Sequence, residues 1–120
     1  MTIRRMKTYD GAQGFVYQYY FVGKRPALGG APDGPGTEYI FDVSSDRKAT
    51  FAVSILLPDA TLRNWATSHG RGLSEAEQYA AVKMRLFRGF DEVENMRAAG
   101  RQLSLSDESL DQLLGTLGVK

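Results

Sequence analysis

The chain has 120 residues, apolar and charged fractions of 42% and 24%, and a formal net charge of +1. This length and composition predict one folded domain over residues 1–120 and exclude a largely disordered chain. Because the sequence contains no cysteine and a single histidine, disulfides, cysteine metal sites and multi-histidine centres within one chain are excluded, and we expect no metal and no cofactor.

The first residues, MTIRRMKTYD, contain no apolar stretch of the kind found in a secretory signal. No apolar run elsewhere is long enough to cross a bilayer. We therefore expect a cytoplasmic protein without a membrane partner. Basic and acidic residues number 15 and 14, and this near-balance disfavours a dedicated nucleic-acid binder, which usually concentrates a basic excess on one face.

The N-terminal half predicts β-strands. Runs rich in β-branched and aromatic residues are separated by turn residues, which is typical of strands joined by hairpins. Short connections predict antiparallel pairing, because parallel neighbours need long crossovers. The four predicted strands are Thr2–Tyr9, Phe15–Val22, Glu38–Val43 and Ala49–Leu57. Between the second and the third lies the Gly- and Pro-rich segment Gly23–Gly36, for which we expect a long loop.

Beyond Pro58 the apolar period changes from two to 3.6 residues, which predicts helices. The three predicted helices run from Asp59 to about Ser68, from Ser74 to Gly100, and onward from Ser106, each of the three starting residues serving as an N-cap. Gly89 in the interior of the second helix predicts close packing of another element. The predicted fold class is α+β: a four-stranded antiparallel meander followed by three helices packed on one face of the sheet, in the order ββββααα.

Alternate residues of a strand point to opposite faces of a sheet. One set on the predicted strands is uniformly apolar and is expected to face the helices: Phe15, Tyr17, Tyr19, Phe21, Tyr39, Phe41, Val43, Phe51, Val53, Ile55 and Leu57. The opposite set is mixed, but it contains apolar residues that need a cover of their own: Val16, Tyr20, Val22, Ile40 and Leu56. Such a surface is typical of an interface. Either a second copy of the chain covers it, which we favour, or the first strand or the last helix wraps over it.

His69 lies on the apolar stripe of the first predicted helix together with Trp65, and Arg71 follows shortly after. An imidazole is a potential general acid or base, although a histidine near a helix C-terminus is also ordinary capping. No nucleophile with an orienting acid stands at a characteristic spacing, so we assign no catalytic residue. The candidate binding residues are Arg25, Trp65, His69 and Arg71.

These observations favour a non-enzymatic binding or interaction protein that self-associates as a dimer or larger, with a small molecule or another protein as a possible further partner. One alternative is a small enzyme in which His69 acts as the acid–base residue under the Gly23–Gly36 loop. The other is a nucleic-acid-associated regulator that uses basic residues near the N-terminus and on the second predicted helix: Arg4, Arg5, Lys7, Lys83, Arg85 and Arg88.

Overall fold

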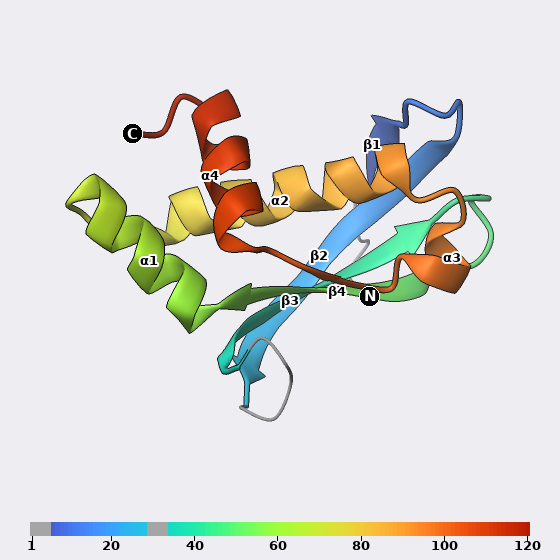
Figure 1. Cartoon of the computed structure of the whole chain (residues 1–120). Helices are drawn as coiled ribbons and strands as arrows, with labels where there is room; N and C mark the ends of the chain where they lie inside the picture. The colour runs from blue at the N-terminus through green and yellow to red at the C-terminus, as the bar shows by residue number, and fades with distance from the viewer. Residues whose placement is uncertain (1–5, 29–33) are drawn as a thin grey trace.

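The computed structural model describes residues 6–28 and 34–120, which form an α+β fold with α1, α2 and α4 above a twisted sheet (Figure 1). The strands are β1 (Lys7–Asp10), β2 (Val16–Ala27), β3 (Gly36–Ser44), β4 (Phe51–Pro58) and β5 (Gln102–Ser104). The helices are α1 (Asp59–His69), α2 (Glu75–Glu92), α3 (Met96–Ala99) and α4 (Asp107–Thr116). The predicted α+β class is confirmed, whereas the numbers of strands and helices differ from the prediction.

The sheet has the order β1-β2-β3-β4-β5. The first four strands pair antiparallel with their neighbours in sequence, as predicted, although the start of the first predicted strand lies outside the described residues. β5 lies parallel to β4, with Leu103 opposite Ile55. The prediction of four purely antiparallel strands is therefore wrong. The additional strand has 3 residues, too few to display a period of two, and it forms because its neighbours in space offer pairing partners.

β2 continues to Ala27, past its predicted end at Val22. A bulge between Phe21 and Gly23 shifts its register against β3, and pairing then resumes through Lys24. Glycine, proline and charged residues are depleted in strands, so local composition predicted a loop where pairing with β3 holds the backbone extended. The predicted bounds of the Gly23–Gly36 loop are therefore wrong. The connection spans residues 28–35, of which 29–33 lie outside the described residues.

The inner face of the sheet, which the helices cover, carries the core as predicted. Phe41, Val53 and Ile55 have no exposed surface, and Tyr17 stacks on Phe90 of α2 with 4.3 Å between ring centroids. Phe15 is the exception, since 48% of its surface is exposed. It precedes the first residue of β2 and belongs to the hairpin loop, so the alternation of the strand does not apply to it.

The starts of the two longer C-terminal helices agree with the sequence. Ser74 accepts a hydrogen bond from the backbone N–H of Glu77, and the Glu77 carboxylate accepts one from Ser74 in return. Ser106 caps α4 in the same reciprocal manner with Ser109. The predicted cap at Asp59 is wrong, because Pro58 occupies the N-cap position and provides no side-chain hydrogen bond.

The segment after α2 departs most from the prediction. The helix ends at Glu92 instead of Gly100, and Val93 adopts an extended conformation with φ −91° and ψ 115°. Asn95 then caps the short helix α3 by accepting from the N–H of Ala98. A continuous helix would carry the chain away from the sheet, whereas this break returns it to β4. Gly89 permits close packing, as predicted: a Cβ there would lie 2.9 Å from Leu103 Cδ1.

Among the described residues, no helix is long and apolar enough to span a membrane.

Candidate functional site

Trp65, His69 and Arg71 meet at the C-terminal end of α1. Trp65 and His69 are four residues apart, which places them on one side of the helix, and their rings stack with centroids 4.1 Å apart and planes 14° from parallel. Gly70 has φ 73° and ends the helix in the left-handed conformation. This reversal brings the Arg71 guanidinium to 5.2 Å from the centre of the Trp65 ring.

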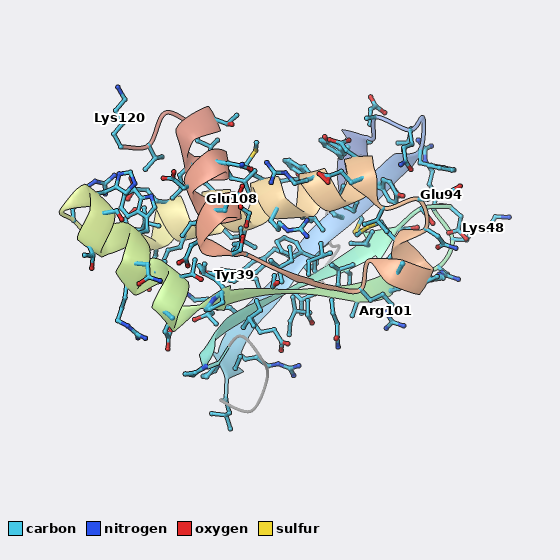
Figure 2. The ribbon with its side chains drawn as sticks, viewed as in Figure 1. Tyr39, Lys48, Glu94, Arg101, Glu108 and Lys120 are labelled. Carbon is cyan, nitrogen blue, oxygen red and sulfur yellow. The ribbon has the colours of Figure 1, made fainter. Side chains whose placement is uncertain are left out.

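Helix α4 completes a groove against this end of α1. His69 Nε2 lies 3.1 Å from Asp111 Oδ1, and Asn64 Nδ2 donates to Asp107 Oδ2 over 2.8 Å. The resulting α1–α4 groove has a volume of about 300 Å³, and its lining includes Asn64, Trp65, Ser68, His69, Asp107 and Asp111. Figure 2 shows the side chains around it, with Glu108 labelled on α4 and Lys120 at the C-terminus.

The chemistry available in the α1–α4 groove centres on the imidazole. The carboxylate of Asp111 can orient the ring, an arrangement suited to general acid–base work. The His69 side chain is 30% exposed, so a small ligand can reach it. The indole Nε1 of Trp65 is fully buried and has no hydrogen-bond partner among the described residues, which costs about 1–3 kcal/mol. No group of described side chains is arranged to hold a metal ion.

Arg71 is committed to structural contacts. Its guanidinium donates to both carboxylate oxygens of Glu77 at 3.0 and 2.8 Å, and to the backbone oxygens of Gly72 and Lys120. The hydrogen bond from Arg71, followed by the one from the Ser74 N–H, lowers the pKa of Glu77 to about 2. Arg71 therefore fastens the start of α2 and the C-terminus beside Trp65, and few of its donors remain for a ligand.

Arg25, the fourth candidate binding residue, is not in this groove. It lies on β2, where its Nε donates to Glu38 Oε1 of β3 over 2.6 Å. Both residues belong to the outer face of the sheet, opposite the helices. The four residues singled out from the sequence thus divide into a cluster of three and a separate ion pair.

The outer face carries the five predicted interface residues. Of these, Val16 and Val22 are exposed by 38% and 46%, and the other three are partly buried. Tyr20, Val22, Ile40 and Leu56 form a diagonal across β2, β3 and β4, which we call the outer patch. Val22 is followed by Gly23, which pairs with Ile40, and Leu56 pairs with Glu38, which lies two residues before Ile40 on the same face. Successive members of the patch are therefore diagonal neighbours. Val16 stands apart near the first hairpin, opposite Asp10.

The proposed intramolecular covers of the outer face are not supported by the described elements. β1 lies within the sheet beside β2, and α4 lies with α1 and α2 on the inner side (Figure 1). Tyr20 and Asp42 of the outer face do have interaction partners.

The sequence reasoning missed the contribution of α4 to the groove. Asp107 and Asp111 are four residues apart and so share one side of a helix, a signal that was present in the sequence. Their approach to Asn64 and His69 depends on how α4 crosses α1, and nothing in a single sequence specifies that crossing.

No protein-family model, no curated protein and no solved structure matches this chain.

Proposed function

We propose that this chain is a non-enzymatic interaction protein that self-associates through the outer face of its sheet. The observation that carries the proposal is the outer patch of Tyr20, Val22, Ile40 and Leu56, over which no described helix lies. An antiparallel sheet with one solvated face normally alternates apolar and polar residues cleanly. Apolar side chains grouped on the solvent side instead are typical of a surface that another molecule covers.

The surroundings of the outer patch favour a second copy of the same chain as that molecule. The oppositely charged Arg25 and Glu38 lie side by side at its margin, with side chains 66% and 26% exposed. Two copies related by a twofold axis can exchange these charges, with each Arg25 facing the partner's Glu38, because a twofold interface is self-complementary. An apolar centre with a polar margin is the usual anatomy of a protein interface. The net charge of +1 opposes association little.

Light scattering coupled to gel filtration, with protein from about 5 to about 500 µM, tests this proposal. We expect a concentration-dependent shift from monomer to dimer or larger. Val22→Asp is expected to weaken the association at least about tenfold, because it buries an unpaired charge in the interface. Leu117→Asp is the matched control, since Leu117 is 41% exposed on the helix side of the molecule. Monomeric wild-type protein at the highest concentration, or an equal effect of both variants, would refute the proposal.

A second candidate function is acid–base catalysis on a small molecule in the α1–α4 groove. It is favoured by the 3.1 Å contact between His69 and Asp111. Hydrolysis of an activated ester such as p-nitrophenyl acetate provides a generic assay. His69→Gln should abolish any rate above that of buffer, and Asp111→Asn should reduce it. A wild-type rate no greater than that of His69→Gln contradicts this candidate for acyl substrates and leaves self-association as the function.

A further inference from the structure

A hollow of about 500 Å³ lies where the first hairpin, the β3–β4 turn and the segment between α2 and α3 meet, and we call it the hairpin hollow. This volume is typical of sites for small molecules. Its lining combines apolar and polar side chains and includes no lysine, arginine or histidine: Phe15, Tyr17, Ser45, Glu94, Asn95 and Met96. It shares no lining residue with the α1–α4 groove and contains no member of the outer patch.

The Tyr17 hydroxyl is a polar group without a partner at the floor of the hairpin hollow. The ring is held by stacking on Phe90, with centroids 4.3 Å apart, and only 2% of the residue's surface is exposed. The hydroxyl has no hydrogen-bond partner among the described residues, yet it is not fully enclosed as Trp65 Nε1 is. The exposed part of Tyr17 therefore includes its hydroxyl, and this part lines the hollow.

Glu94 gives the hairpin hollow its charge. It stands between α2 and α3 (Figure 2), is exposed, and its carboxylate forms no ion pair or hydrogen bond with the described residues. The two acidic residues just before it differ in this respect. Asp91 accepts a hydrogen bond from the Tyr9 hydroxyl, and Glu92 lies 3.7 Å from Arg88. The hollow therefore presents one negative charge that no described side chain compensates.

We propose that the hairpin hollow binds a small protonated amine with an apolar body, whose ammonium group pairs with Glu94. An ammonium group has three donors and no acceptor, and the Glu94 carboxylate and the hydroxyls of Tyr17 and Ser45 can all accept. Phe15, which is 48% exposed, offers a ring for the apolar body and for a cation–π contact. The Gly11 N–H donates to the Phe15 carbonyl over 2.8 Å, so this wall is held in place before a ligand arrives. A neutral ligand leaves the carboxylate uncompensated, and an anion is repelled by it.

NMR titration of isotope-labelled protein with phenethylamine, an amine that is protonated at neutral pH, tests the site. Phenethyl alcohol, a neutral molecule of the same size, is the comparison ligand. Shifts should centre on the Met96 methyl and the Asn95 side-chain amide. The amine should bind at least about tenfold more tightly than the alcohol. Glu94→Gln should remove this preference, because it deletes the charge and keeps the size of the side chain. Since Glu94 is exposed, we expect this variant to fold as the wild type does.

Tyr17→Phe distinguishes a ligand-binding hydroxyl from a structural one. It should weaken binding of phenethylamine at least about threefold. It should leave the urea midpoint unchanged, because the hydroxyl has no partner to lose among the described residues. Tyr9→Phe is the matched control, since the Tyr9 hydroxyl donates to Asp91 over 2.8 Å. That variant should lose stability and retain binding.

Glu108→Gln controls for unspecific attraction of the amine to carboxylates, because Glu108 is exposed and lines the α1–α4 groove instead. Its affinity for phenethylamine should equal that of the wild type. Equal affinities for the amine and the alcohol, binding that Glu94→Gln leaves unchanged, or an equal loss in Glu108→Gln would overturn the proposal. Val22→Asp should retain amine binding whether or not the chain self-associates, so the failure of one proposal is distinguishable from that of the other.

Discussion

The two faces of the same sheet differ in how far the described helices cover their side chains. On the inner face, Phe41, Val43 and Val53 are fully buried beneath the helices. On the outer face, the alternate positions of these strands hold Ile40, Asp42 and Ala52, and no described helix covers them. On the inner face, helices of the same chain bury the apolar side chains. Under the self-association proposal, a second copy covers the apolar residues of the outer face, so that one strand contributes to both a core and an interface.

The inner face should be the more sensitive of the two to truncation. Phe90 has no exposed surface and contacts the rings of Tyr17, Tyr19 and Tyr9. Phe90→Ala is expected to lower the free energy of unfolding by about 3–5 kcal/mol, because it removes these contacts and leaves a cavity. Urea denaturation followed by circular dichroism measures the change. A loss below about 1 kcal/mol would mean that the aromatic cluster is not the centre of the core.

The margin of the inner face should show an intermediate effect. The Tyr9 hydroxyl donates to Asp91 Oδ2 over 2.8 Å, so Tyr9→Phe is expected to lower the free energy of unfolding by about 1 kcal/mol at neutral pH. Burial, then the hydrogen bond to Asp91 and the charge of Asp91, raise the pKa of Tyr9 from 10.0 to about 12. The folded state therefore holds this proton more tightly than the unfolded state does.

The associated stability should be complete below about pH 10 and disappear as the pH rises through about 12. Urea denaturation of wild type and Tyr9→Phe from about pH 9 upward compares the two curves. The alkaline loss should be smaller in the variant, since the phenyl ring that replaces the phenol has no proton to release. Parallel curves would show that folding does not raise the pKa of Tyr9.

The outer face should be nearly insensitive when the protein is dilute. Val22 is 46% exposed at the bulge of β2, so Val22→Thr is expected to change the free energy of unfolding by less than about 0.5 kcal/mol at low micromolar concentration. Denaturation curves recorded at low and high protein concentration separate the contributions. Under the self-association proposal, wild-type stability rises with concentration more than that of the variant. A large loss in the dilute protein would assign Val22 to the fold of the monomer.

The parts of the fold that the sequence predicted best are the strands that line the inner face and the capped helix starts. Strands β2, β3 and β4 were located because their inner residues alternate over several positions. The capping box at Ser74 and the N-cap at Ser106 marked two helix starts. The return of the chain at Val93 and the pairing of Leu103 beside Ile55 were not predicted, because these features arise from contacts between distant parts of the sequence. Local patterns record periodic burial and caps, and they contain little information on a short strand held by its neighbours.

The candidate site was predictable to a smaller extent. Trp65 and His69 were identified together because they share one helical stripe. Asp111, which gives the imidazole its partner, was not connected with them, since its position depends on the packing of α4. Arg25 was grouped with these residues although it belongs to the outer face. The bulge shifts the register of β2 against β3, and this shift places Arg25 opposite Glu38 on the outer face.

Because β5 follows three helices in the sequence, its pairing with β4 completes the sheet late in the synthesis of the chain. While the chain is being synthesised, β4 can pair with β3 as soon as both have left the ribosome, but its other edge stays open until residues 102–104 emerge. An open strand edge is a template for pairing with other chains, and contacts between residues far apart in sequence form slowly. Residues made after the first four strands therefore close this edge of β4, so a product truncated before Gln102 would be exposed to aggregation even with those four strands in place.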